Sequence, residues 1–159
     1  MPRPSPPKNE VRRLPPLLRR AWYGLNQAFR QRVAHLNLTP DQFSILRWLS
    51  EGDAAGLTQR DITELMASDP NTITSTLSRM EKAGMISRHP HERDRRANRV
   101  QIREHGKTIF AQAREIAMEL QVQILQTLPE TRRERFLREL EQVAAACGAV
   151  ASEGVGGKQ

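Results

Sequence analysis

The sequence predicts a mainly α-helical protein that carries one small β-hairpin. Three observations lead to this prediction. Apolar residues recur every three or four positions through most of the 159 residues, which is typical of amphipathic helices. Residues 99–103 instead alternate polar and apolar side chains, as a half-buried strand does. Aromatic residues make up only 4% of the chain, which disfavours an all-β fold.

The N-terminal region divides into a tail and a helix. Residues 1–13 are rich in proline and arginine and predict a disordered basic tail. Helical periodicity then covers residues 14–37, where Pro15 and Pro16 suit a first helical turn. The apolar stripe of this helix consists of Leu14, Leu18, Trp22, Leu25, Phe29, Val33 and Leu36.

Three shorter helices follow between residues 38 and 84. Thr39 begins the first as a cap, with Gln42 placed to complete a capping box. Thr58 caps a second helix over about residues 59–66, after a loop from Asp53 to Leu57. Asp69 caps the third, which ends at Gly84, a residue suited to a left-handed C-terminal cap. The segment therefore predicts a helix-turn-helix.

The hairpin comes next and is strongly basic. Strands over residues 85–89 and 99–103 flank an exposed polar loop, and Val100 and Ile102 should face inward. Residues 86–103 contain six arginines and two acidic residues, so this hairpin carries +4 of the net charge of +7. Arginines in such a loop suit the negative potential of a narrow minor groove of DNA.

Long helices follow over residues 105–147. Their apolar stripes keep the near-heptad spacing of helix–helix packing, and they place Phe136, Leu140, Val143 and Cys147 inward on the last helix. Residues 148–159 predict a flexible tail. The first helix and these last helices are therefore expected to form a dimer, although core helices of a monomer would show the same pattern.

The third short helix offers a polar outer face that suits DNA bases and phosphates. Small hydroxyl and amide side chains near a helix N-terminus can approach the major groove closely. The predicted contact residues are Asn71, Thr72, Thr74, Ser75, Ser78 and Arg79. A solvated helix face would look the same in isolation, and the adjacent basic hairpin favours DNA binding.

These segments together resemble the multiple-antibiotic-resistance regulator (MarR) family. The resemblance rests on the helix-turn-helix, the run from Arg79 to Ile86, the motif Asp94-x-Arg96-x-x-Arg99 and Gly106, and it extends over residues 14–146. It implies a winged helix-turn-helix domain over residues 38–104, on a homodimer built by the first and last helices. The residues before Gly106 depart from the family pattern, which affects only the cap of the long helix.

The resemblance also implies that Asp94 orients Arg96 for entry into the minor groove. The predicted DNA-binding residues of the hairpin, or wing, are Arg93, Asp94, Arg95, Arg96 and Arg99. We expect a cytoplasmic, sequence-specific regulator of transcription, a repressor that binds a pseudo-palindromic operator in double-stranded DNA. The alternative is a non-specific basic architectural protein. The sequence contains no recognisable catalytic motif and predicts neither a cofactor nor a metal.

Regulators of this family often bind small anionic aromatic molecules, so a pocket for a phenolic effector is a further expectation. Its candidate residues are Trp22, Phe29, His35, Phe43, Arg47 and Trp48. The simpler interpretation is that the aromatic residues pack in the core while Arg47 is solvated, and general packing statistics favour it. A redox role for Cys147 is disfavoured, because a buried thiol without a basic neighbour is usually inert.

Overall fold

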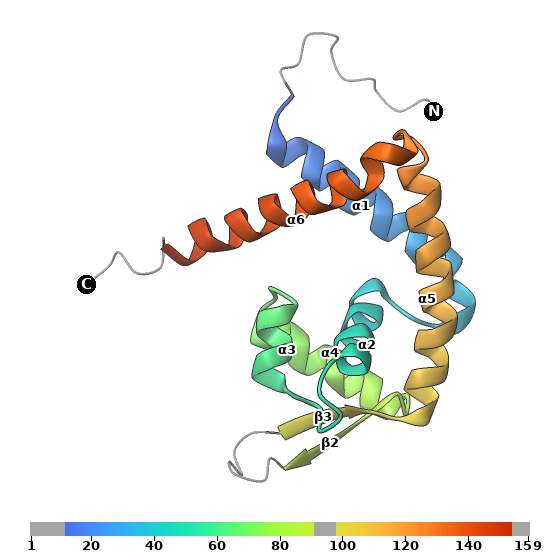
Figure 1. Cartoon of the computed structure of the whole chain (residues 1–159). Helices are drawn as coiled ribbons and strands as arrows, with labels where there is room; N and C mark the ends of the chain where they lie inside the picture. The colour runs from blue at the N-terminus through green and yellow to red at the C-terminus, as the bar shows by residue number, and fades with distance from the viewer. Residues whose placement is uncertain (1–11, 91–97, 154–159) are drawn as a thin grey trace, which may run out of the picture. The chain divides into compact units, whose positions relative to one another are not determined.

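The computed structural model of the chain describes residues 12–90 and 98–153 (Figure 1). Its helices are α1 (Leu14–Arg32), a short 3-10 helix η1 (Ala34–Leu36), α2 (Pro40–Glu51), α3 (Gln59–Leu65), α4 (Pro70–Lys82), α5 (Glu104–Leu125) and α6 (Glu130–Glu153). Its strands are β1 (Leu57–Thr58), β2 (Ile86–Pro90) and β3 (Asn98–Ile102). The chain forms two compact units, with the division between Ala117 and Met118. The predicted mainly α-helical fold with a β-hairpin is confirmed.

Local capping determines where the central helices begin. The Thr39 hydroxyl accepts the Gln42 N–H at 3.2 Å while the Gln42 side chain accepts the Thr39 N–H at 3.0 Å. Thr58 forms the same reciprocal pair with Asp61. The predicted caps are therefore confirmed, and each satisfies backbone N–H groups that have no partner within the helix. Gly84 has a φ of +72°, in agreement with its predicted left-handed cap.

The sheet has three antiparallel strands rather than the two predicted. Strand β3 lies between β1 and β2, with Ile86 opposite Ile102, Arg88 opposite Val100, and Leu57 also opposite Val100. Strand β1 has only two residues, too few to show a periodic pattern, so the sequence interpretation placed Leu57 in a loop. A glycine precedes it because Gly56 has a φ of +85° and a Cβ there would lie 2.3 Å from the Val100 carbonyl oxygen.

The core of the first unit joins α1 and α5 to α2 and the other elements of residues 38–104. Its largest fully buried side chains are Val33, Ile45, Leu46, Ile62, Leu77, Met80, Ile86 and Val100. The Phe43 ring lies 4.8 Å from that of Phe29 and 5.6 Å from that of Phe110, centroid to centroid. Each such aromatic pair adds about 0.5–1.5 kcal/mol beyond its buried area. This cluster fixes α2, and with it the domain that carries the candidate site.

Several predicted stripes are not buried within the described chain. The first helix ends at Arg32 rather than 37, because Val33 leaves the helical conformation as its C-cap and the chain continues as η1. Asn37, in a left-handed conformation, ends η1. On α1, Phe29 is buried but Leu14, Leu18, Trp22 and Leu25 are exposed. The periodic pattern identifies an apolar face, and it does not determine whether the same chain supplies a neighbour for that face.

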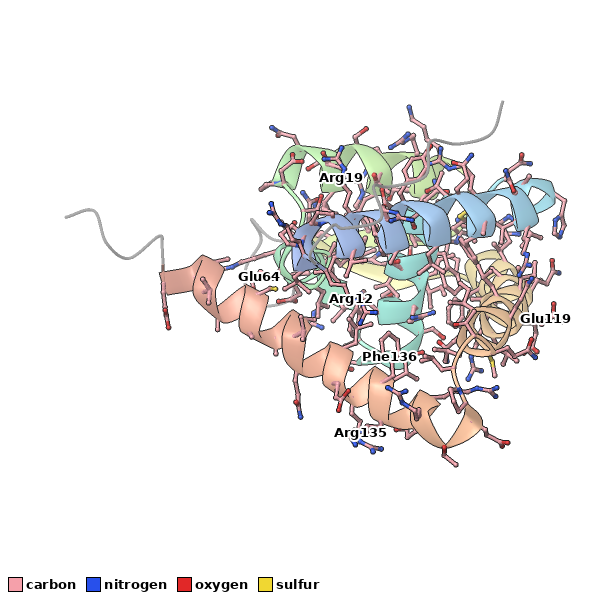
Figure 2. The ribbon with its side chains drawn as sticks, turned by 90° about the horizontal axis from the view of Figure 1, so that it is seen from above. Arg12, Arg19, Glu64, Glu119, Arg135 and Phe136 are labelled. Atoms are coloured by element: carbon pink, nitrogen blue, oxygen red, sulfur yellow. The ribbon has the colours of Figure 1, made fainter. Side chains whose placement is uncertain are left out.

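The last helix, α6, also differs from its prediction in the burial of its apolar side chains. No residue of α6 is buried, so the expectation that Phe136 and Cys147 point inward is wrong within the described chain. Figure 2 shows Phe136 and its neighbour Arg135 projecting from this helix. The helix also continues to Glu153, through residues predicted as a flexible tail. Within this unit, Arg133 Nε donates to the carbonyl oxygens of Leu125 and Leu128, which closes the turn between α5 and α6.

Candidate DNA-binding surface

Helix α4 presents one buried and one exposed face. Ile73, Thr76, Leu77 and Met80 are buried and attach it to the domain. The Asp69 side chain accepts the Thr72 N–H at 2.9 Å and also accepts from the Thr72 hydroxyl. These two hydrogen bonds lower the pKa of the Asp69 carboxyl. The helix start is therefore an ordered cap with an ionised carboxylate turned toward the backbone.

The outer face of α4 is accessible, as predicted. Of the predicted contact residues, Asn71, Thr72, Thr74, Ser75 and Arg79 are exposed, and Ser78 is half-buried. The sequence interpretation omitted Lys82, which is exposed at the end of the same helix. Helical spacing places it on one line with Asn71, Ser75 and Ser78. This line of side chains on α4 therefore ends at the positively charged Lys82.

Helix α3 contributes a residue that sequence reasoning missed. Gln59, the first residue of α3, donates from Nε2 to the Thr74 hydroxyl at 2.7 Å. The same hydroxyl donates to the Pro70 carbonyl oxygen at 2.8 Å. Gln59 thereby holds the Thr74 side chain in one orientation. Only its position at a helix start could have indicated this role.

An ion pair joins α4 to the hairpin. Arg88 on β2 donates to Glu81 Oε2 from Nε at 2.9 Å and from Nη2 at 2.6 Å, and its backbone N–H reaches Oε1 at 3.2 Å. Its Nη2 also lies 3.3 Å from Ser78 Oγ. The hydrogen bonds from Arg88 lower the pKa of the Glu81 carboxyl, which is therefore ionised at neutral pH. Arg88 is thus a link between the helix and the hairpin, a role that its charge alone did not reveal.

The tip of the hairpin, with Arg93, Asp94, Arg95 and Arg96, lies outside the described residues. The predicted pairing of Asp94 with Arg96 therefore stays a prediction. Arg99 is described and is half-buried; its Nη1 donates to the Gly56 carbonyl oxygen at 2.9 Å. Its charge also contributes to the lowered pKa of Asp61, after the hydrogen bonds from Thr58. Arg99 lies near the start of β3, opposite His89, and the bond to Gly56 holds it against the residue that precedes β1.

The residues of the predicted effector pocket differ in burial. Phe29 and Phe43 are buried against each other, and the Arg47 guanidinium lies 4.9 Å from the centroid of the Phe43 ring. Trp22, His35 and Trp48 are exposed. The phenylalanines therefore match the core-packing alternative, and Arg47 makes a cation–π contact with one of them.

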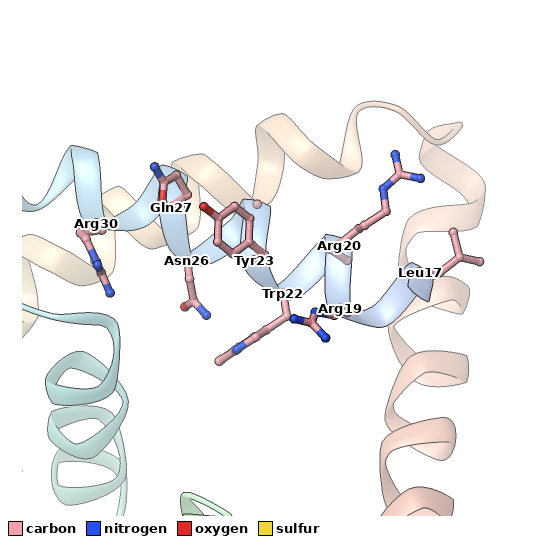
Figure 3. A pocket seen from close by; sticks show the side chains of 10 residues that line it. Leu17, Arg19, Arg20, Trp22, Tyr23, Asn26, Gln27 and Arg30 are labelled. Carbon is pink, nitrogen blue, oxygen red and sulfur yellow. The ribbon is translucent and has the colours of Figure 1, made fainter. Parts of the chain in front are cut away.

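An open cavity of about 860 Å³ lies instead along α1 (Figure 3). It is lined by Leu17, Arg19, Arg20, Ala21, Trp22, Tyr23, Gly24, Asn26, Gln27 and Arg30. Of the predicted pocket residues, only Trp22 belongs to it. All of its lining residues belong to α1, and Figure 3 shows Arg20 and Trp22 projecting from the helix in opposite directions.

Among the described residues, no three His, Cys, Asp or Glu side chains come together to hold a metal ion. No helix in the described ranges is long and apolar enough to cross a membrane.

The chain is a winged helix-turn-helix protein. This class is defined by the order of its helices, by the exposed α4 and by the β2–β3 hairpin that follows α4 in the sequence. Residues 38–97 match the family model described as "MarR family". This segment is therefore a MarR-family domain, as its sequence motifs predicted. A comparison with curated protein sequences gives no match.

Solved structures with the same fold extend the similarity beyond this segment. A crystal structure of MarR has a TM-score of 0.80 at 23% sequence identity and covers 94% of this chain and 99% of its own. The S. aureus MepR–DNA complex has a TM-score of 0.78 at 20% identity, with 86% and 99% covered. The transcriptional repressor CouR bound to a 23-mer DNA duplex has a TM-score of 0.73 at 26% identity, with 80% and 89% covered.

Proposed function

We propose that this protein is a regulator of transcription that binds specific sequences in double-stranded DNA. The observation that carries the proposal is the exposed polar face of α4 beside an arginine-rich hairpin, joined to it through Arg88 and Glu81. An α-helix fits into the major groove of DNA, and a basic β-hairpin beside it reaches the adjacent minor groove. MepR and CouR, which share the fold, are solved in complex with DNA.

The protein acts as a homodimer in this proposal. On α1, Leu14, Leu17 and Trp22 are 50%, 49% and 61% exposed, and Phe136 on α6 is 40% exposed. So many large apolar side chains on the surface favour burial against a second copy. A two-fold dimer then requires half-sites about 34–36 Å apart on the DNA.

Repression with release by an anionic aromatic effector completes the proposal. CouR is described as a transcriptional repressor, and one of its structures holds p-coumaroyl-CoA. In this chain the α1 cavity supplies Trp22 and Tyr23 for an aromatic ring and Arg19, Arg20 and Arg30 for negative charge. Binding there would act on DNA affinity through α1, which packs on α2 by Phe29 and Phe43.

The test is selection from a library of randomised DNA duplexes with the full-length protein, followed by titration at fixed salt. A regulator enriches one pseudo-palindrome and binds it at least about 1,000-fold more tightly than random duplex. Equal affinity for all duplexes with a steep salt dependence would establish the alternative, a non-specific architectural protein.

Substitution Arg96→Ala then tests the hairpin. If this arginine enters the minor groove, the change weakens binding to the selected duplex by about 1–3 kcal/mol. Arg114→Ala, which removes the same charge from an exposed position on α5, should have a much smaller effect. Equal losses in both variants would mean that the hairpin contributes only its net charge.

A further inference from the structure

The polar side chains on the outer face of α4 differ in one chemical respect, which is whether their hydrogen-bonding groups already have partners in the protein. The Thr72 hydroxyl donates to Asp69 Oδ2. The Thr74 hydroxyl donates to the Pro70 carbonyl oxygen and accepts from Gln59 Nε2. In both threonines the single hydroxyl proton is therefore used inside the protein.

This use limits what either threonine can offer to DNA. A hydroxyl has one proton to donate, and phosphate oxygens and the N7 atoms of purines are acceptors only. Thr72 and Thr74 can bind neither without breaking an internal hydrogen bond. Each hydroxyl oxygen can still accept a hydrogen bond, for which the major groove offers the N6 amino group of adenine and the N4 amino group of cytosine. The methyl of each threonine can contact the complementary apolar group of the major groove, the 5-methyl of thymine.

Asn71 and Ser75 differ from the two threonines, because their side-chain hydrogen-bonding groups are not used within the described part of the protein. Among the described residues, neither side chain makes a hydrogen bond or an ion pair, and both are exposed. The Asn71 amide can both donate and accept, which matches the N7 acceptor and N6 donor on the major-groove edge of adenine. Helical spacing places Asn71 and Ser75 on the outermost line of α4, with Thr72 and Thr74 on either side of it.

From this distribution we infer that α4 reads A·T base pairs, with Asn71 bound to adenine and the methyl groups of Thr72 and Thr74 in contact with thymine methyls. The inference rests on the proposed function and specifies the sequence that the helix recognises. Gln59 takes part as a positioning residue, because its amide holds the Thr74 hydroxyl toward the protein. Ser75 and Ser78 supply weaker, adaptable contacts, and Arg79 and Lys82 at the C-terminal end of the helix face phosphate.

The decisive experiment uses the full-length protein and the duplex selected from the randomised library. Each thymine of a half-site is replaced in turn by deoxyuridine, which removes only the 5-methyl group. We expect one or two positions at which affinity falls about three- to fivefold, the factor for burying one methyl group. Replacement of one adenine by 7-deazaadenine, which lacks N7, should weaken binding through Asn71 in the same way.

Conservative variants then assign each contact. Thr72→Ser and Thr74→Ser keep the hydroxyl and its internal hydrogen bonds but lack the methyl. Each should lose about three- to fivefold in affinity for the thymine duplex and become insensitive to deoxyuridine at one position. Asn71→Ala should become insensitive to 7-deazaadenine. Thr108→Ser, at an exposed α5 hydroxyl bonded to the Glu104 carbonyl oxygen, is the matched control and should behave as the unsubstituted protein does.

The possible failures are distinguishable. If a palindrome is selected but no deoxyuridine or 7-deazaadenine substitution alters affinity, base reading by α4 as inferred is wrong and the regulator proposal stands. If the serine variants stay as sensitive to deoxyuridine as the unsubstituted protein, the methyl contacts belong to other residues and the assignment is overturned. If no sequence is enriched, both the proposed function and this inference fail. Thermal midpoints of all variants show that each one is folded.

Discussion

Alanine substitution at three glycines should change stability in three different ways, and Gly56 gives the largest effect. Gly56 precedes β1 with a φ of +85°, and an added Cβ would lie 2.3 Å from the Val100 carbonyl oxygen and 2.8 Å from Gln101 Cγ. At Gly84 the φ is +72°, but nothing lies within 4 Å of an added Cβ. Gly24 lies inside α1 and also has open space around it.

The magnitudes follow from these environments. A left-handed conformation costs a residue with a Cβ about 1–2 kcal/mol, which is the whole loss expected for Gly84→Ala. Gly56→Ala has the same cost and must also move β1 away from β3. That shift breaks the bond from Arg99 Nη1 to the Gly56 carbonyl oxygen and adds about 1 kcal/mol, for a total of about 2–3 kcal/mol. Gly24→Ala removes a flexible residue from a helix and should stabilise the protein by about 0.5–1 kcal/mol.

Urea unfolding followed by circular dichroism measures these differences, provided that every variant is studied at one protomer concentration. The expected order of unfolding free energy is Gly24→Ala, unsubstituted protein, Gly84→Ala, Gly56→Ala. Equal losses at Gly56 and Gly84 would show that the close approach to Val100 adds nothing. A loss at Gly24 would show that the helix surface there is packed rather than open.

Two further predictions concern acidic residues. Hydrogen bonds from Thr58 lower the pKa of Asp61 below its ordinary 3.8, so the stabilisation they give is complete above about pH 4 and disappears as the pH falls through the lowered pKa. Thr58→Ala should lose about 1 kcal/mol at pH 7, with a smaller difference from the unsubstituted protein near pH 2; a constant difference would contradict the linkage. Glu81→Gln removes the charge that binds Arg88, and because the pair is partly exposed the expected loss is about 1 kcal/mol. Its DNA affinity should fall by more than that of Glu139→Gln, which breaks an exposed α6 pair with Arg135, and equal affinities would show that the Arg88 link does not position the hairpin.

Features that depend on neighbouring residues could be predicted from the sequence. The caps at Thr39, Thr58 and Asp69 join groups three residues apart, so residue type and spacing were sufficient. The inner and outer faces of α4 were predicted for the same reason, since helical periodicity separates Ile73 and Leu77 from the exposed polar residues.

Features that depend on residues far apart in the sequence could not. Strand β1 forms by pairing with β3, in which Leu57 lies opposite Val100 and Thr58 opposite Arg99. Its two residues carry no periodic signal of their own. The bond from Gln59 to Thr74 crosses 15 positions, and that from Arg99 to Gly56 crosses 43. No local pattern distinguishes these side chains from solvated ones.

The amino-acid sequence alone was sufficient for the kind of domain, the starts of its central helices and the face of α4 that is accessible. Those properties arise from interactions within one or two helical turns. Only the tertiary structure decided that the Gln59 amide occupies the Thr74 hydroxyl, because that hydrogen bond joins residues 15 positions apart on two different helices. A side chain's hydrogen-bonding capacity is limited, and the partners that occupy it are chosen by folding.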